Sequence, residues 1–481
     1  MTDMGAPLSI VDRNLHEVTV ADRHYIFHIP STGLFERDPL TEDILATLRS
    51  GNAYDSENLV NDLAARHDPD DIASALAELH ALELVSDGSD PDETRQALEL
   101  ENFPLNTVVL NVNTGCNLSC TYCYKEDLDE PADGKRMSLQ TAQDSVEMLL
   151  RESPDQDRYN IIFFGGEPLT NLELIKQVVA WAEPKFAGLR KQVDFSLTTN
   201  ATLLNEKVID YLHEHNIGIA VSMDGPESFH NRNRITVGGQ GTYSTVVRKV
   251  KLLLNRYSAR PVGARVTLTR GITDVEAIWD HLFNDLGFHE VGFAPVTSGD
   301  IADYNLTDEE VAAVFSNMKA LGRRYLAAAL EGRSIGFSNM HQMLTDLHEG
   351  TKKALPCGAG VGMVAIDHEG GVNLCHRFTG SELPLFGDIQ NGLDKPALNQ
   401  FMNERLNLSD QGCSTCRIRN LCAGGCYHES YARYGDPVRP TWHYCDLMRD
   451  WVDFCIEIYT EILEKNPGFF NRFLTPRRAM S

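Results

Sequence analysis

The sequence predicts a mixed α/β protein with a partial (β/α)6 barrel at its centre, a small module before the barrel and a cysteine-rich domain after it. Short runs rich in β-branched and aromatic residues alternate with amphipathic stretches, and they cover residues 107–112, 160–164, 194–199, 217–222, 264–269 and 290–296. Connections as long as these join parallel strands, and six such units leave a barrel incomplete. We therefore expect the functional site at the carboxyl ends of those strands.

The composition is that of an ordinary globular protein with room for two or three folding units. The chain has 481 residues, of which 42% are hydrophobic and 23% charged, and a domain takes roughly 150 residues. The net charge of −26 repels phosphate backbones, so nucleic acid is not an expected partner. No run approaches the roughly 18 apolar residues that span a bilayer and the first residues lack a secretory signal, so we expect a cytoplasmic protein without a membrane partner.

Residues 1–90 are expected to form a separate module. Apolar residues alternate on either side of the turn at Asp22-Arg23, which predicts a hairpin with one buried face. Three stripes at helical spacing follow, with helix starts near Thr41, Ser56 and Asp70. The polar and acidic segment 86–93 then predicts a linker.

The rest of the chain divides by composition into four parts. We assign residues 105–300 to the barrel, 301–355 to a helical bridge, 356–450 to the cysteine-rich domain, and 451–481 to a last helix and tail. Grouped cysteines in a reducing compartment indicate metal or redox chemistry rather than disulfides. Because the segment 356–450 is too rich in loops to fold by apolar burial alone, bound metal is expected to hold it together.

A three-cysteine motif, Cys116-x3-Cys120-x2-Cys123, directly follows the first barrel strand. Three thiolates can hold one face of a cubane iron–sulfur cluster and leave one iron open to an external ligand. A structural zinc site is the alternative, but zinc needs a fourth protein ligand. An open iron favours catalysis over electron storage.

The spacing of this motif, with Tyr122 before its last cysteine, resembles the radical S-adenosylmethionine (SAM) family. The resemblance implies that SAM chelates the open iron and that one electron cleaves it to methionine and a 5′-deoxyadenosyl radical. Further matches follow the second and fourth strands. The residues that the resemblance assigns to SAM binding are Tyr122, Gly165, Gly166, Glu167, Ser222 and Asp224, with Asn200 and Arg234 as weaker candidates. The glycines would let the backbone approach the methionine moiety closely.

The carboxyl-terminal cysteines resemble the SPASM extension, which holds auxiliary iron–sulfur clusters. By that resemblance a distal cluster is bound by Cys413, Cys416, Cys422 and Cys445, and a proximal cluster by Cys357, Cys375 and Cys426, giving three [4Fe-4S] clusters in all. Members with a full proximal set carry one more cysteine, whereas this chain has only Met363 and Asp367 in the corresponding stretch. Either a non-cysteine ligand completes the proximal cluster, or one iron is open and can bind a substrate thiolate. Structural zinc is again the alternative.

The general base is not identified by the sequence. Sulfatase-maturing relatives have an acid directly after the second proximal cysteine, where this chain has His376. That difference argues against oxidation of serine or cysteine to formylglycine, although a histidine can accept a proton near neutral pH. Asp388 and Asp410 are the other candidates near the cysteine-rich tail.

The amino-terminal module resembles the winged-helix-like peptide-recognition module of peptide-modifying radical enzymes, in which a strand edge accepts an extended polypeptide. A DNA-binding winged helix is the alternative, but no basic recognition helix is present. The whole chain is most similar to the maturases of quinohemoprotein amine dehydrogenase. That implies thioether formation between cysteine sulfur and methylene carbons of Asp or Glu in the small subunit of that enzyme, with an electron donor such as flavodoxin or ferredoxin. Another peptide maturase, forming formylglycine or carbon–carbon crosslinks, and a non-enzymatic iron–sulfur carrier are the competing interpretations.

Overall fold

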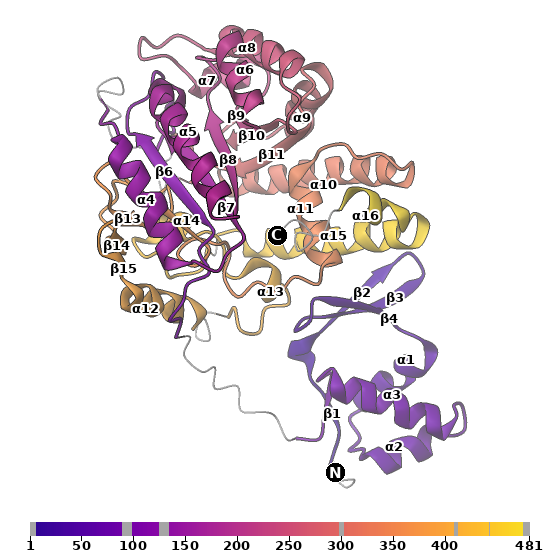
Figure 1. The fold of residues 1–481 in the computed structure, drawn as a ribbon. Coiled ribbons are helices and arrows are strands. Elements are labelled where there is room, and N and C mark those ends of the chain that lie inside the picture. Colours follow the sequence, from indigo (N-terminus) through magenta and orange to yellow (C-terminus); the bar gives the residue numbers. More distant parts are fainter. Residues whose placement is uncertain are drawn as a thin grey trace.

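The computed structural model describes residues 6–88, 99–124, 134–297, 303–407, 412–441 and 443–474. An α/β body containing the barrel forms one end of the molecule and the amino-terminal module the other (Figure 1). Helices α15 (Cys445–Lys465) and α16 (Gly468–Phe473) lie between them. The expected linker falls mostly on residues 89–98, outside the described ranges.

The module is a three-stranded antiparallel sheet packed on three helices. Its elements are β2 (Leu15–Val20), β3 (Arg23–His28), β4 (Gly33–Glu36), α1 (Pro39–Arg49), α2 (Ser56–Leu63) and α3 (Pro69–Ala81), and the short strands β1 (Ser9–Ile10) and β5 (Val85–Ser86) pair beside them. The predicted hairpin is confirmed as β2 and β3. Helices α1 and α3 begin one or two residues before Thr41 and Asp70, and α2 begins at Ser56 as expected. The side chains of Asp38, Asp55 and Asp68 cap these starts by accepting hydrogen bonds from backbone N–H groups.

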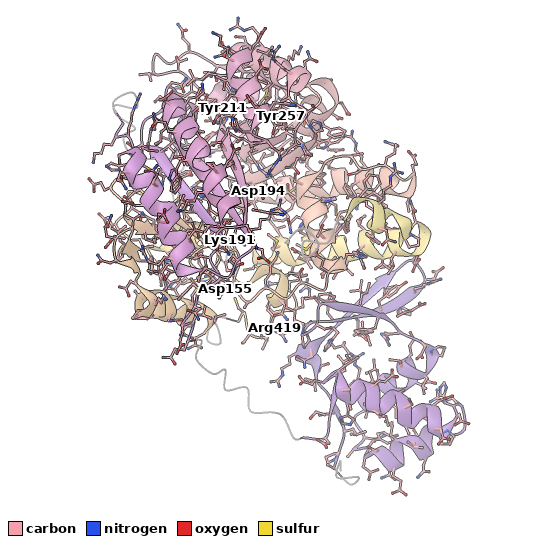
Figure 2. All side chains as sticks on the ribbon, in the orientation of Figure 1. Asp155, Lys191, Asp194, Tyr211, Tyr257 and Arg419 are labelled. Atoms are coloured by element: carbon pink, nitrogen blue, oxygen red, sulfur yellow. The ribbon has the colours of Figure 1, made fainter. Side chains whose placement is uncertain are left out.

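Both faces of the module's sheet are buried, but against different partners. Leu15 and Ile26 face the module's own helices, whereas Val20, Tyr25 and Phe27 belong to the core of the main body. Polar contacts add to this docking: Arg419 donates to the Arg13 carbonyl at 2.8 Å (Figure 2), and His16 pairs with Asp453 of α15 at 2.9 Å. The module is therefore fixed to the body rather than tethered only by its linker.

The expected six-stranded parallel arrangement is present. The strands are β6 (Thr107–Asn113), β7 (Arg158–Gly165), β8 (Gln192–Thr199), β9 (Gly218–Ser222), β10 (Gly263–Leu268) and β11 (Glu290–Pro295), paired in that order. The helices that follow them are α4 (Leu139–Glu152), α5 (Leu172–Gly188), α6 (Glu206–Glu214), α7 (Glu227–Asn233), α8 (Tyr243–Arg256) and α9 (Val275–Trp279). At the amino end of β8, Asp194 pairs with Arg158 and Arg260 (Figure 2), at the opposite end from the cysteine loop.

The sheet continues beyond the six barrel strands, which the sequence did not indicate. Strand β12 (Met363–Ile366) pairs in parallel with β6, and β13 (Val372–Asn373) pairs with β12 in antiparallel fashion. The cysteine-rich domain is therefore joined to the barrel through one sheet. This junction places Cys375 close to the strand that leads into the first cysteine motif.

The remaining elements are mostly helical. They are α10 (Asp308–Leu330) and α11 (Ser338–His348), then β14 (Gly387–Asp388), β15 (Gly392–Leu393), α12 (Lys395–Leu406), α13 (Arg419–Cys422) and α14 (Tyr427–Tyr434). The predicted bridge is α10 and α11. Cys455 is fully buried in α15, as expected for a core residue. Within the described ranges, none of the helices has the length and apolar composition needed to cross a membrane.

Candidate functional site: three groups of thiols

The first cysteine motif forms a loop at the carboxyl end of β6. Burial raises the pKa of the Cys116 thiol to about 12 and that of Cys120 to about 11, and the neighbouring thiols of the motif add to both shifts. The Leu118 amide donates to the Cys116 sulfur at 3.4 Å. Buried thiols that face one another are held as thiolates once a metal binds them, so this donor set fits an iron–sulfur cluster.

The loop is held from one side by the segment that follows β9 and α7. Ser119 donates its backbone N–H to the Ile235 carbonyl at 2.9 Å, and Thr121 does the same to Asn233 at 3.0 Å. The Thr121 hydroxyl also donates to the Asn233 side chain at 2.7 Å. These bonds fix the path of the loop between its second and third cysteines.

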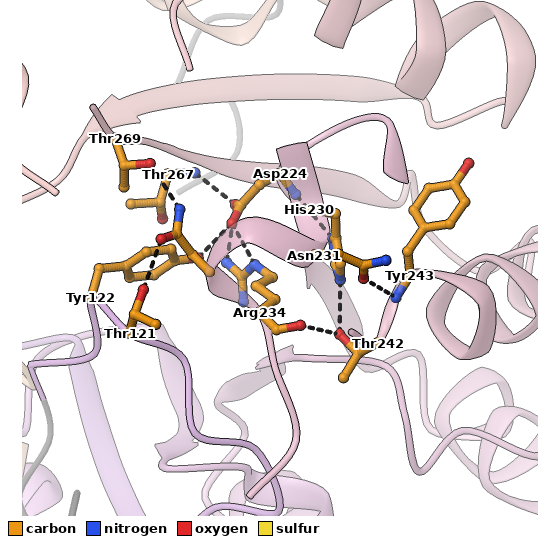
Figure 3. A network of polar contacts seen from close by, with 11 residues as sticks. Thr121, Tyr122, Asp224, His230, Asn231, Arg234, Thr242, Tyr243, Thr267 and Thr269 are labelled. Atoms are coloured by element: carbon orange, nitrogen blue, oxygen red, sulfur yellow. Dashed lines mark hydrogen bonds and ion pairs between the residues drawn. The ribbon is translucent and has the colours of Figure 1, made fainter. Parts of the chain in front are cut away.

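Tyr122, Asp224 and Arg234 meet in one buried network (Figure 3). The Tyr122 hydroxyl donates to Asp224 at 2.6 Å, and the Arg234 guanidinium donates to both carboxylate oxygens at 2.8 and 3.2 Å. The Thr267 amide donates to the same carboxylate at 3.0 Å. Because these polar groups are bonded to one another, the structure gives them a positioning role for the loop, and direct contact with SAM stays a prediction.

The electrostatics of this network follow from its burial. Burial acts to lower the pKa of the Arg234 guanidinium, but the charge of the Asp224 carboxylate raises it, and the net effect is a raised pKa, so the guanidinium remains charged. Behind the pair, burial lowers the pKa of His230 to about 4. The neutral His230 ring then contacts the Asp224 amide and the Thr242 hydroxyl at 3.4 and 3.0 Å. No sequence motif marks His230 or Thr242, and the sequence analysis missed both.

Glu167 ties the second strand end to the third. Its carboxylate accepts from the Leu169 amide at 3.1 Å, the Thr199 hydroxyl at 2.8 Å and the Asn200 amide at 2.7 Å. Burial raises the pKa of Glu167 to about 7, although these donors act to lower it. Asn200 in turn donates to Asn117 at 2.9 Å, beside the Cys116 sulfur. Glu167 and Asn200 therefore support the loop that carries the first cysteine motif.

Gly165 and Gly166 are required by contacts within the chain itself. A Cβ atom on Gly165 would lie 2.2 Å from the Asn113 carbonyl oxygen, and one on Gly166 would lie 2.1 Å from that of Gly115. Neither backbone atom can move without displacing the loop. Ser222 ends β9, two residues before Asp224, so this candidate also lies at the expected strand end.

The carboxyl-terminal thiols influence one another in two sets, and the binding of clusters by these sets stays a prediction. Burial raises the pKa of Cys375 to about 12, and the Cys426 and Cys357 thiols add to the shift. Burial likewise raises the pKa of Cys413 to about 11, and the thiols that add to it are those of Cys416, Cys422 and Cys445. Among the described residues, none of the sets is drawn closely enough to hold a single metal ion.

The acid–base candidates are placed very differently. The His376 ring packs against Phe164 at the end of β7, with ring centroids 4.3 Å apart, so it lies at the barrel mouth. Asp388 instead holds the turn between β14 and β15, where it accepts from the Gln390 and Asn391 amides at 2.8 Å; this engagement argues against its role as a base. Asp410 lies outside the described residues.

Asp367, near the missing proximal ligand, is also engaged in a turn. One carboxylate oxygen accepts from the Glu369 and Gly371 amides at 3.0 and 2.9 Å, and the other accepts from Asn373 at 3.2 Å. Met363 is the first residue of β12. Met363 is partly buried against the core, and the Asp367 carboxylate is occupied by its own turn rather than placed as a spare ligand.

A group of residues that the sequence did not indicate lies between the first motif and the proximal thiols. Tyr124 directly follows Cys123, and its ring is 5.0 Å from the Arg377 guanidinium and 5.5 Å from the His428 ring. Burial raises the pKa of Tyr124, Arg377 lowers it, and the Cys123, Cys375 and Cys426 thiols raise it. Tyr124 therefore lies within electrostatic range of both thiol groups.

Comparison with known proteins finds relatives that match much of the chain. Residues 110–282 match the model of the Radical SAM superfamily. A cysteine-type anaerobic sulfatase-maturating enzyme of Clostridium perfringens (strain 13 / Type A) is 24% identical over 366 residues, which cover 73% of this chain and 96% of that protein. The radical SAM cyclopropyl synthase TigE of Paramaledivibacter caminithermalis is 22% identical over 370 residues, covering 73% of this chain and 74% of that protein.

A solved structure gives the same picture of the fold. Native anSMEcpe with bound AdoMet superposes with a TM-score of 0.60 at 22% identity, covering 77% of this chain and 99% of that chain. The superfamily match includes the first cysteine motif, the glycine pair and the Asp224 network. The chain therefore contains a radical SAM domain at residues 110–282 and is homologous to an anaerobic sulfatase-maturating enzyme over 73% of its length.

Proposed function

We propose that this protein is a radical SAM maturase that forms intramolecular thioether bonds in a polypeptide, joining cysteine sulfur to methylene carbons of Asp or Glu side chains. The proposed substrate is the small subunit of quinohemoprotein amine dehydrogenase. The observation that supports the proposal is the meeting of the first motif with the segments that carry the proximal thiols. The ring of Tyr124, next to Cys123, lies 5.0 Å from the guanidinium of Arg377, two residues after Cys375, and 5.5 Å from the ring of His428, two residues after Cys426. Relatives support action on a polypeptide, since one solved structure is anSMEcpe with bound AdoMet and the Cp18Cys peptide.

The residues divide the work as follows. Cys116, Cys120 and Cys123 would hold a catalytic [4Fe-4S] cluster, and the two groups in the cysteine-rich domain would hold auxiliary clusters. When bound, SAM and these clusters supply hydrogen-atom abstraction and an acceptor for one electron. Tyr122, Asp224 and Arg234 keep the loop in place, and Glu167 fixes the strand ends beneath it.

Thioether formation removes two hydrogens from the polypeptide. One leaves the methylene carbon as a hydrogen atom and ends in 5′-deoxyadenosine, and the other leaves the thiol as a proton. His376, at the barrel mouth against Phe164, is placed to accept that proton. The clusters held by the carboxyl-terminal cysteines would supply an acceptor for the electron released when the carbon–sulfur bond forms, and the electron-transfer partner would take it from there. Cys357, Cys375 and Cys426 would give the proximal cluster only three thiolates, which would leave a position for the substrate thiolate.

A sulfatase-type oxidation to formylglycine is the second candidate, because the relatives include sulfatase-maturating enzymes. Mass spectrometry of the small subunit before and after reaction, combined with alkylation of its free thiols, separates the two. Each thioether lowers the mass by two hydrogens and removes one cysteine thiol, whereas oxidation of serine to formylglycine lowers the mass equally but leaves every thiol free to be alkylated. Deuterium on the target methylene should appear in 5′-deoxyadenosine. Label arriving from the cysteine β-carbon instead would refute thioether formation, and so would crosslinking that survives replacement of the substrate cysteine by serine.

A further inference from the structure

Arg377 occupies the junction between the two thiol groups, and the chemistry described above does not use it. It follows Cys375 by two positions, in the loop after β13. Its guanidinium lies over the Tyr124 ring at 5.0 Å and donates to the hydroxyl of Thr297. Thr297 follows β11, the last barrel strand. The first motif, the barrel mouth and the cysteine-rich domain therefore meet at this one side chain.

The two groups that contact the Arg377 guanidinium are themselves held in place by His428. His428, two residues after Cys426, is buried and contacts Thr297 at 3.3 Å. Its ring packs against both Tyr124 and Phe378, each with centroids 5.5 Å apart. The Tyr124 ring and the Thr297 hydroxyl thus fix the position of the guanidinium, which lowers the entropy lost when a ligand binds it.

The Arg377 guanidinium has more N–H groups than it uses in hydrogen bonds with described residues. Arginine carries five N–H groups, and the side-chain contacts of Arg377 with described residues are the hydrogen bond to Thr297 and the Tyr124 ring; it makes no ion pair with them. The Glu429 carboxylate interacts electrostatically with Arg377, but its bonded partner is Arg433, at 2.7 Å. Arg377 therefore keeps N–H groups for a ligand.

Two arginines elsewhere in the structure are bonded more fully. Arg234 is paired with Asp224, and Arg405 donates to four backbone carbonyls. In a chain with a net charge of −26, an arginine beside the site that is not bonded to a carboxylate points to an anionic ligand.

We propose that Arg377 binds the carboxylate of the substrate Asp or Glu side chain whose methylene carbon is crosslinked. This inference rests on the proposed function and identifies how the target residue is chosen. A guanidinium and a carboxylate form two parallel hydrogen bonds with a fixed geometry. In Asp the Cβ methylene is bonded directly to that carboxylate, and in Glu the Cγ methylene is. Holding the carboxylate at Arg377 therefore holds the reacting carbon between the first motif and the proximal thiols.

The carboxylate of SAM can form the same two hydrogen bonds with Arg377. The experiment therefore has to distinguish SAM from the substrate Asp or Glu side chain as the source of the carboxylate. The probe is the small-subunit polypeptide, fluorescently labelled, in its natural form and with the target Asp or Glu changed to the amide. Its affinity is measured by anisotropy with reconstituted wild-type enzyme and with Arg377→Gln. Each single change should weaken binding roughly tenfold, and the two together should cost no more than one alone, because both remove the same pair.

Two further variants make the result specific. Arg377→Lys keeps the charge but loses the two-pronged geometry, so its affinity should fall between those of wild type and Arg377→Gln. Arg472→Gln is the matched control, since Arg472 is an exposed arginine over Phe473 at 5.0 Å on α16. It should bind the natural polypeptide as the wild type does.

Several results would overturn the assignment. If the losses from Arg377→Gln and from the amide polypeptide multiply, the two groups do not meet. If equilibrium dialysis shows that Arg377→Gln weakens SAM binding as strongly as polypeptide binding, the guanidinium serves the SAM carboxylate. A wild-type enzyme that forms thioethers while the coupling is absent removes this inference and leaves the proposed function standing. A wild-type enzyme that leaves the mass of the small subunit unchanged removes both.

Discussion

The Asp224–Arg234 pair is expected to be a principal support of the barrel's functional end, and Asp224→Asn tests it. The Asp224 side chain is completely buried, and four donors converge on it: two from Arg234, one from Tyr122 and the Thr267 amide. Removing one member of a buried ion pair costs about 3–5 kcal/mol, since the other charge is left uncompensated. The amide oxygen of Asn still accepts some of these donors, so we expect a loss of about 3 kcal/mol.

Urea unfolding followed by far-ultraviolet circular dichroism measures this loss. With a slope of about 3 kcal/mol per molar urea for a large chain, the midpoint should fall by about 1 M. Asp210→Asn is the matched control, because Asp210 also accepts two hydrogen bonds from one arginine, Arg256, but on the exposed surface between α6 and α8. Its midpoint should stay at the wild-type value.

A midpoint for Asp224→Asn that coincides with that of Asp210→Asn would refute the positioning role. Tyr122, Asp224 and Arg234 would then contribute through contacts with a bound ligand, as their resemblance to SAM-binding residues implies. Iron analysis gives a second reading. If the network holds the loop, Asp224→Asn should lose iron from the first motif while the cysteine-rich domain keeps its own.

Three further predictions concern other parts of the molecule. Replacing Cys116, Cys120 or Cys123 by Ala should stop 5′-deoxyadenosine formation and leave iron in the carboxyl-terminal domain; continued SAM cleavage would contradict the cluster assignment. Gly166→Ala should abolish activity because its Cβ would lie 2.1 Å from the Gly115 oxygen. Gly188→Ala should be tolerated, because its Cβ would have no neighbour within 4 Å. Equal activity of the two variants would disprove the steric argument. Glu36→Pro should weaken binding of the small-subunit polypeptide without unfolding the module. The Arg37 N–H bonds to the His24 carbonyl, so the Glu36 N–H points away from β3, at the outer edge of β4. Unchanged affinity in the anisotropy assay would exclude that edge as the docking site.

The barrel was predictable because its strands are buried and carry their own signal. The runs at 107–112 and 264–269 are β-rich and separated by amphipathic helices, and the structure has β6 and β10 there within one residue at each end. Strand β12 was missed for the opposite reason. Met363–Ile366 is only four residues long, and its partner β6 lies more than 250 positions earlier. No local pattern reports a pairing across such a separation.

The candidate site shows the same division between local and distant information. Cys116, Cys120 and Cys123 were identifiable because one loop carries all three thiols. The meeting of Tyr124 with Arg377 and His428 was not, because the three residues come from separate segments and none belongs to a motif. Asp388 illustrates why nearness in sequence is weak evidence: this acid near the cysteines accepts hydrogen bonds within its own turn, and its role as a base stays a prediction.

Helix α15 contacts both the amino-terminal module and the cysteine-rich domain. It begins at Cys445, one of the distal thiols, and near its other end Glu464 accepts a hydrogen bond from Tyr25 of the module. Midway, Asp453 accepts from both His16 of the module and Arg417 of the cysteine-rich domain. The two parts also meet directly, since Asn420 donates to the Ile29 carbonyl at 2.8 Å. On the proposed function, the position from which a polypeptide held at the module reaches the thiols is therefore set by α15 and these contacts rather than by the expected linker.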